Sequence, residues 1–251
     1  MKKITHYIRL LRTLIYSFFN EKNFNYKGTR LNYIFKKGAT NYLFVVFPAV
    51  SKKPMFNYVT TFRKTPHNIL FLKDTFGEPG SYFLGRDFKF NLYEIVDQLI
   101  NKVTKGKKFI ICSIGSSKGG SSALFYSLMC KQEVQKVFVG SPQYSLGEYF
   151  YYHGGKSYLK NICTNDDLSE AKKLDKFCHD LVLNSKKRIT IYLYGSSNED
   201  EFHLKDINLL INDLNKTKNK VTFIDGKFNR HEGLADSFKK FLMNDLNALL
   251  E

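Results

Sequence analysis

The segment that most restricts the fold of this chain is Gly115-Ser-Ser-Lys-Gly119, which has the pattern Gly-x-Ser-x-Gly. An apolar, β-branched run from Phe109 to Ile114 precedes it, and a helix-compatible run from Ser121 follows it. This order predicts a sharp turn between a strand and a helix, in which the flanking glycines prevent side-chain clashes. Ser117 would then present its hydroxyl group at the N-terminus of the helix, where the helix dipole favours negative charge.

Two other interpretations compete with this one, because glycine and serine also mark ordinary turns. A phosphate-binding Walker loop needs its lysine directly after the last glycine and before serine or threonine. Here Lys118 precedes Gly119 and Gly120, so the lysine is in the wrong place. The motif therefore favours acyl-transfer chemistry at Ser117, and a plain structural turn is the interpretation that stays open beside it.

Predicted strands and helices alternate along most of the 251 residues. This alternation predicts βαβ units and a mostly parallel sheet with helices on both faces. The expected class is thus α/β, in one domain over residues 1–251, with residues 143–185 as a candidate small cap. Strands are expected at 30–36, 42–47, 68–72, 108–113, 136–140, 188–194 and 220–224, and helices at 92–103, 121–131, 168–183, 204–214 and 234–250.

Residues 1–28 are expected to form an N-terminal helix and a linker. Apolar residues recur from Ile4 to Phe19 at spacings of three and four, which is typical of an amphipathic helix. Arg9 and Arg12 interrupt the apolar region and no small-residue cleavage site follows, so a signal peptide is not expected. Two interpretations stay open: the helix packs against the domain, or it lies with its basic residues on an anionic membrane.

The net charge of +16 makes nucleic acid or a membrane surface worth considering. Only seven of the 39 basic residues are arginine, whose planar side chain suits phosphate recognition, and the lysines form no block of five or six. Nucleic-acid binding is therefore not expected, and anionic glycans or lipids fit the charge better. No stretch of 18 residues is free of charge, so a transmembrane span is not expected either.

The four cysteines form neither a Cys-x-x-Cys pair nor a zinc-binding spacing; they are Cys112, Cys130, Cys163 and Cys178. They are expected to be small apolar residues in a reducing compartment. The expected location is the cytoplasm, with the basic helix as a candidate contact to the inner face of the membrane. No metal-binding cluster is apparent in the sequence, so neither a metal nor an organic cofactor is expected.

Residues suited to activating a serine follow three predicted strands in the chain order serine, acid, histidine. Ser117 follows the strand at 108–113, an acidic turn follows the strand at 188–194, and His231 follows the strand at 220–224. Because active residues of open parallel sheets gather at the carboxyl ends of the strands, we expect these side chains to meet. Three such segments are far more specific than the serine motif alone.

The expected roles follow from the chemistry of the side chains. His231 would take the serine proton as general base, and a carboxylate would orient its ring and stabilise the charged form. Asp200 is the preferred carboxylate for its central place in the acidic turn, and Glu199 and Glu201 are the alternatives. Asp74 also ends a predicted strand, where contact with substrate and a structural cap are both open interpretations.

The tetrahedral intermediate of acyl transfer needs two backbone N–H donors. One is expected from Lys118, directly after the nucleophile. The second is expected from the loop that follows the strand at 42–47. Pro48 has no N–H group, so Ala49 is the better candidate and Val50 the second. A plain strand-to-helix turn is the alternative interpretation of this loop.

Four short motifs add a family resemblance: Phe47-Pro-Ala49, Phe56-Asn-Tyr58, Asp74-Thr-Phe-Gly77 with Gly80-Ser-Tyr-Phe83, and Gly115-Ser-Ser-Lys-Gly-Gly120. Over about residues 30–250 the chain resembles the α/β-hydrolase superfamily. The four motifs are similar to a bacterial group that is tied to surface glycans. That group includes capsule-biosynthesis proteins of the XcbB and CpsF type and accessory-secretion proteins that O-acetylate glycans on adhesins.

The resemblance implies a serine-dependent acyl esterase or O-acetyltransferase with a glycan or acyl-ester substrate. It implies Ser117 as nucleophile and His231 as base, and it leaves the acid at 199–201 open, because the acid varies between aspartate and glutamate in such folds. Two other functions stay open. One is a general carboxylesterase, thioesterase or lipase, and the other is a non-catalytic scaffold of hydrolase fold in polysaccharide biosynthesis.

Overall fold

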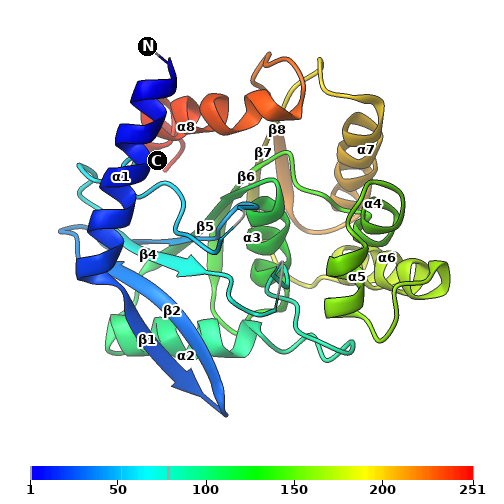
Figure 1. The fold of residues 1–251 in the computed structure, drawn as a ribbon, viewed down its shortest axis with the longest axis horizontal. Helices are drawn as coiled ribbons and strands as arrows, with labels where there is room; N and C mark the ends of the chain where they lie inside the picture. The colour runs from blue at the N-terminus through cyan, green and yellow to red at the C-terminus, as the bar shows by residue number, and fades with distance from the viewer. Residues whose placement is uncertain (1, 52, 78–79, 251) are drawn as a thin grey trace.

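The strands of the computed structural model, which describes residues 2–51, 53–77 and 80–250, form one eight-stranded sheet (Figure 1). They are β1 (Lys22–Tyr26), β2 (Thr29–Lys36), β3 (Tyr42–Val46), β4 (Asn68–Lys73), β5 (Ile110–Ser116), β6 (Val134–Gly140), β7 (Thr190–Gly195) and β8 (Lys220–Asp225). Their order across the sheet is β1-β2-β4-β3-β5-β6-β7-β8. The pairs β1–β2 and β2–β4 are antiparallel, and the other neighbouring pairs, from β4 across to β8, are parallel. The mostly parallel α/β sheet is therefore confirmed.

Helices lie on both faces of this sheet (Figure 1). They are α1 (Lys2–Asn20), α2 (Tyr93–Thr104), α3 (Lys118–Met129), α4 (Leu146–Tyr152), α5 (Lys156–Ile162), α6 (Leu168–Leu183), α7 (Glu201–Asn215) and α8 (Leu234–Asn244), with short 3-10 turns η1 (His231–Gly233) and η2 (Asn247–Leu249). None of the helices in the described part of the chain combines the length and the apolar character that crossing a bilayer requires.

The central strands supply apolar side chains to both faces, because successive residues of a strand point in opposite directions. In β3, Leu43 and Val45 join the cluster beneath α2, α3, α6 and α7, whereas Phe44 and Val46 join the cluster beneath α8. All four side chains are buried. Strands that are covered on both faces need continuous apolar sequence, which explains why β3, β4 and β5 could be predicted.

The linker expected before residue 28 is corrected by the structure, because it contains β1. This strand pairs with β2 through a two-residue turn at Lys27 and Gly28, which both have positive φ, as a tight hairpin turn of this kind requires. Phe24 and Tyr26 pack against the core from one side of β1, and the polar residues between them leave only a weak strand signal.

Residues 143–185 form the three helices α4, α5 and α6. Helix α4 packs against α6, and α6 also contacts α3 and α7. The bounds of α6 are those expected from the sequence, whereas α4 and α5 were not expected as helices. Gly147 allows the close approach of α4 to α6, because a Cβ atom there would overlap the backbone of Ala171. That this segment caps the sheet stays a prediction.

Candidate active site

Ser117 alone forms the turn between β5 and α3. The strand runs to Ser116 and the helix begins at Lys118, three residues earlier than the sequence suggested. The backbone of Ser117 has φ +50° and ψ −127°, a conformation that residues other than glycine rarely adopt and that is found at functional turns. Its N–H group donates a hydrogen bond of 2.7 Å to the carbonyl oxygen of Gly140 at the end of β6, which holds the turn in place.

Two glycines let the backbone pack closely around this turn. A Cβ atom at Gly115 would overlap the carbonyl group of Gly119, and a Cβ atom at Gly119 would lie 2.6 Å from the carbonyl oxygen of Phe47. The second contact brings the loop after β3, which carries Pro48 and Ala49, against the start of α3. The first N–H groups of a helix have no intrahelical partner, so the N–H of Lys118 is a donor of this kind.

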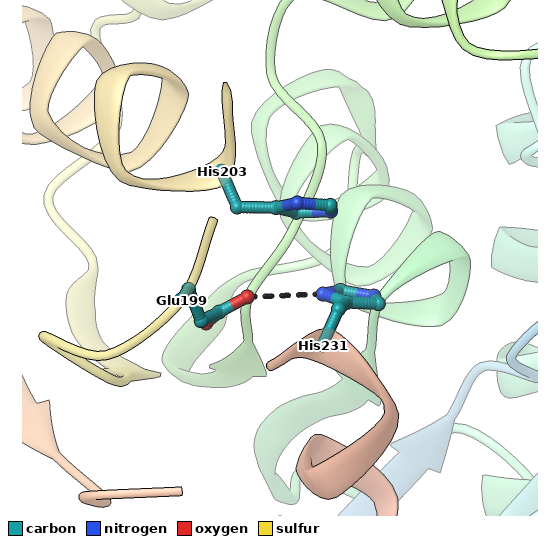
Figure 2. A group of neighbouring side chains, drawn as sticks. All are labelled: Glu199, His203 and His231. Carbon is teal, nitrogen blue, oxygen red and sulfur yellow. Dashed lines mark hydrogen bonds and ion pairs between the residues drawn. The ribbon is translucent and has the colours of Figure 1, made fainter. Parts of the chain in front are cut away.

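A chain of hydrogen bonds connects Ser117 to a histidine and a carboxylate. Ser117 Oγ lies 2.9 Å from His231 Nε2, and His231 Nδ1 lies 3.0 Å from Glu199 Oε2. The Glu199 side chain is fully buried, and the hydroxyl of Ser141 donates to its other oxygen. Because an ionised carboxylate only accepts, Nδ1 carries the proton and Nε2 is left to accept from the serine. Figure 2 shows Glu199 and His231 facing each other across this bond.

The loops that carry the carboxylate and the histidine are joined to each other. Ser196, after β7, donates a hydrogen bond of 2.6 Å to the carbonyl oxygen of Phe228. The N–H of Gly226, after β8, donates one of 2.7 Å to the carbonyl oxygen of Gly195. These bonds join the two loops at the carboxyl ends of their strands, and His231 reaches Ser117 from one of these loops.

The expected pairing of Asp200 with His231 is corrected: Glu199 occupies that position. Asp200 is the N-cap of α7, so its carboxylate turns toward the first turn of that helix and accepts from the N–H of His203 at 3.1 Å. It also bonds the ring Nδ1 of His203 at 2.8 Å. Burial raises the pKa of Asp200, but the hydrogen bonds from His203 outweigh it and lower the pKa overall. The third candidate, Glu201, is an exposed residue in the first turn of α7.

His203 brings a second imidazole ring to the site. Its ring stacks on that of His231, with centroids 4.1 Å apart and planes 22° apart, as Figure 2 shows. Asp200–His203 and Glu199–His231 are thus two neighbouring carboxylate–imidazole pairs. His203 Nε2 is buried and has no hydrogen-bond partner among the described residues.

Glu199, His203 and His231 offer three ligand atoms within 4.8 Å of one another, a spacing at which side chains can share a metal ion. Histidine binds a metal along the lone pair in its ring plane. Because the rings of His203 and His231 are stacked, their lone pairs lie in nearly parallel planes. The ligands of one metal ion must instead point toward a common position. A metal would also displace the hydrogen bonds of His231, so the group fits activation of Ser117 better than it fits a metal.

Gln143 is a member of the site that the sequence analysis missed. Its side-chain amide donates a hydrogen bond of 3.1 Å to Ser117 Oγ. Ser121 in α3 fixes Gln143, because its hydroxyl accepts from the backbone N–H at 2.9 Å and donates to the carbonyl oxygen at 2.7 Å. Gln143 follows the carboxyl end of β6, so the rule that placed the other candidates also applied to it.

The side chain of Lys118 lies inside the molecule and forms an ion pair of 2.8 Å with Asp74, whose side chain is 1% exposed. Asp74 also accepts from the N–H groups of Ser81 and Tyr82, at 2.9 and 3.2 Å. The sequence left two roles open for Asp74, contact with substrate and a structural cap. These contacts are those of a structural cap. The pair joins the end of β4 to the first residue of α3.

Tyr58, in the connection between β3 and β4, lies beside the same turn. The hydroxyl of Tyr58 lies 2.5 Å from Ser116 Oγ, next to the candidate nucleophile. Burial raises the pKa of Tyr58, and the hydrogen bond to Ser116 opposes this only in part. The phenol is therefore neutral and is one of the groups that hold the end of β5.

No protein-family model matches the chain, and no curated protein matches its sequence. Solved structures do match. The capsule O-acetyltransferase of Neisseria meningitidis serogroup A superposes with a TM-score of 0.66 at 19% identity, over 91% of this chain and 93% of that one. Alpha/beta hydrolase domain-containing protein 10 from mouse gives 0.61 at 13% identity, over 92% and 98%.

The Gap123 glycosylation-associated complex of Streptococcus agalactiae also superposes, with a TM-score of 0.63 at 14% identity, over 90% of this chain and 47% of that one. These likenesses define the class of fold, which is that of the α/β hydrolases. Within that class, the chain resembles the capsule O-acetyltransferases in structure.

Proposed function

We propose that this protein is a serine-dependent acyltransferase that moves an acyl group onto a hydroxyl of a bacterial surface polysaccharide. The observation that carries the proposal is the hydrogen-bonded chain from Glu199 through His231 to Ser117, at a strained strand-to-helix turn. A serine hydroxyl is a weak nucleophile, and this arrangement of base and orienting carboxylate activates it. The fold likeness to capsule O-acetyltransferases supports the glycan as acceptor.

In the first half-reaction, Ser117 Oγ attacks the carbonyl carbon of the acyl donor and its proton moves to His231 Nε2. Glu199 stabilises the imidazolium that forms, because its buried carboxylate accepts from Nδ1. The oxyanion receives hydrogen bonds from the N–H groups of Lys118 and Ala49, at the start of α3 and in the loop packed against it. The intermediate then collapses, and the leaving group departs with the proton from His231.

In the second half-reaction, His231 takes a proton from an acceptor hydroxyl, and the hydroxyl oxygen attacks the acyl-Ser117 ester. Ser117 regains its proton from His231 as the new ester leaves. We infer a thioester such as an acyl-coenzyme A as donor, because a variant of the serogroup A enzyme was solved in complex with CoA. Water in place of the sugar hydroxyl would give an esterase, so the acceptor decides between the two activities.

The first experiment is labelling of the intact protein with a fluorophosphonate probe, followed by mass mapping of the adduct. We expect one adduct, on Ser117, that is lost in Ser117→Ala and reduced at least a hundredfold in His231→Ala. Ser121→Ala is not a suitable control because Ser121 fixes Gln143, so the exposed Ser169→Ala serves instead and should label normally. A folded protein that is not labelled would contradict the catalytic proposal and favour a scaffold.

The second experiment separates transfer from hydrolysis. The protein is incubated with radiolabelled acetyl-coenzyme A, with and without de-O-acetylated capsular polysaccharide, and acetate and polysaccharide-bound label are counted. Label on the polysaccharide that depends on Ser117 supports the acyltransferase. Release of acetate at the same rate without polysaccharide would instead identify a general thioesterase or esterase.

A further inference from the structure

Helix α1 turns its apolar face away from the rest of the molecule. Among its described side chains, the exposed large apolar ones are Ile8, Leu11, Leu14, Ile15, Phe18 and Phe19. Positions three and four apart lie on one face of a helix, so these residues form a single stripe. Phe18 and Phe19 are 82% and 77% exposed, whereas Ser17, on the other side of the helix, is buried. The side of α1 that holds Ser17 thus faces the domain, and the residues of the apolar stripe are exposed.

The direction of this stripe is fixed, because the C-terminal end of α1 is tied to the sheet. Glu21, the residue after the helix, accepts from the side-chain amide of Asn32 at 2.5 Å and forms an ion pair of 2.6 Å with Lys73. Tyr16 packs against the buried cluster beneath α8. Figure 1 shows α1 along one side of the molecule, beside β4 and α8.

The charged residues in the sequence of α1 are all of one sign. The sequence of α1 contains no acidic residue, and it contains the cations Lys2, Lys3, Arg9 and Arg12. Beside the helix lies a groove of about 950 Å³, with apolar walls that include Ile15, Phe19, Val59, Phe62 and Leu246. Every charged residue that lines this groove is a cation; these residues are Arg12, Lys36, Arg63 and Lys64.

We propose that α1 and this groove form a docking surface for a membrane rich in anionic phospholipid. The apolar stripe would enter the boundary between headgroups and acyl chains, and the cations would contact the phosphates, as in helices that lie in a membrane interface. A second copy of the chain is a poorer occupant, because its helix would bring the same positive charge. The proposal is independent of the chemistry at Ser117.

The test is sedimentation of the full-length protein with vesicles. Vesicles of phosphatidylcholine with 30% phosphatidylglycerol are compared with vesicles of phosphatidylcholine alone, at 50 and 500 mM NaCl. We expect binding to the anionic vesicles that falls about tenfold at the higher salt and about tenfold without phosphatidylglycerol. Phe18→Glu should lower the partition coefficient about tenfold or more, because it places a charge at the most exposed position of the stripe.

The matched control is Leu183→Glu, an exposed apolar residue at the end of α6, which should bind the vesicles as the unmodified protein does. Both variants change exposed side chains, so circular dichroism and fluorophosphonate labelling should be unchanged in both. Binding that ignores Phe18→Glu, or no binding to anionic vesicles, would overturn the proposal. A change of Phe18→Glu from dimer to monomer in light scattering, without an effect on vesicles, would identify a second copy as the occupant and overturn it also.

Discussion

Glu199 and Asp200 are neighbours in the chain, yet their carboxylates face different histidines. The difference follows from where α7 begins. Asp200 is its N-cap and must turn toward the free N–H groups of the first turn, whereas Glu199 precedes the helix and is free to enter the site. The order of residues in an acidic turn therefore does not identify the orienting carboxylate, but the position of the helix start does.

The first prediction compares these two carboxylates. Glu199→Gln should lower kcat by about 10³- to 10⁴-fold, because an amide cannot stabilise the imidazolium and allows the wrong tautomer of His231. Asp200→Asn should change kcat less than about fivefold, since its partner is His203. The measurement is steady-state hydrolysis of a small acyl ester. Equal losses in both variants would assign the orienting role to the pair of carboxylates jointly.

The second prediction concerns Gln143, whose amide donates to the candidate nucleophile. We expect Gln143→Glu to lower kcat by about 10²-fold, with a smaller change in KM, because a donor to Ser117 Oγ is replaced by a negative charge that repels the negative charge of the tetrahedral intermediate. Gln143→Asn keeps a donor on a shorter side chain and should lose less. The readout is the single-turnover rate of acylation, and an unchanged rate in Gln143→Glu would remove Gln143 from the reaction.

At the scale of elements, the ion pair of Lys118 and Asp74 joins a strand end to the helix start. The third prediction is that Asp74→Asn destabilises the protein by about 3 kcal/mol, because it leaves a buried lysine without its counter-charge. Asp180→Asn breaks an exposed pair with Lys176 and should cost less than about 0.5 kcal/mol. Urea unfolding compares the two, and similar small losses would mean that Lys118 is solvated.

The fourth prediction is a pH dependence at the contact of α4 with α6. Asp175 accepts from the N–H groups of Gly147 and Glu148, at 2.6 and 2.9 Å, and burial raises its pKa from 3.8 to about 6 despite these bonds. The folded protein therefore binds more protons than the unfolded chain between about pH 4 and 6, so this group favours folding more as the pH falls through that range.

The unmodified protein should thus gain about 1 kcal/mol of stability relative to Asp175→Asn when the pH is lowered from 7.5 to 5. The measurement is the free energy of unfolding by urea at both pH values for each protein. The exposed Asp166→Asn serves as the control and should follow the unmodified protein. A stability difference that is the same at both pH values would contradict a raised pKa at Asp175.

Much of the element pattern could be predicted, because the central strands are continuous apolar runs and α6 has clear helical spacing. Strand β1 was missed, since a short edge strand with polar residues on one side has little apolar signal. Helices α4 and α5 were missed because each has only seven residues, too few for a periodic pattern.

The site was predictable to a similar extent. Ser117 and His231 could be expected together, because the carboxyl ends of parallel strands converge. The choice among residues 199–201 depended on a helix boundary, which sequence patterns locate poorly. Gln143 also follows the carboxyl end of a strand, but it has no charge and no motif that would mark it as a catalytic candidate, and its hydrogen bond to Ser117 identifies it.

At the scale of the whole molecule, all four cysteines are free and buried. Burial raises the pKa of Cys112, Cys130 and Cys163 to about 12, and that of Cys178 also rises. A pKa of about 12 in place of 9.0 lowers the thiolate fraction at pH 8 about a thousandfold.

The fifth prediction is that the folded protein reacts with a thiol-specific disulfide reagent at least a hundredfold more slowly than the protein in guanidinium chloride. All four thiols should then become reactive over the same denaturant range as the loss of circular dichroism, because they lie in the two apolar clusters on either face of one sheet. Reaction of one cysteine well before that transition would locate a region that opens separately.

The connection between β3 and β4, described here over residues 47–51 and 53–66, lies against both the start of α3 and the groove beside α1. Its first residues pack on the start of α3 and Tyr58 bonds the end of β5, whereas Val59 to Pro66 line the groove beside α1. Thermodynamic linkage makes any communication along this segment mutual. If an acyl group on Ser117 tightens the hold on a membrane by some factor, the membrane must favour the acylated form by the same factor.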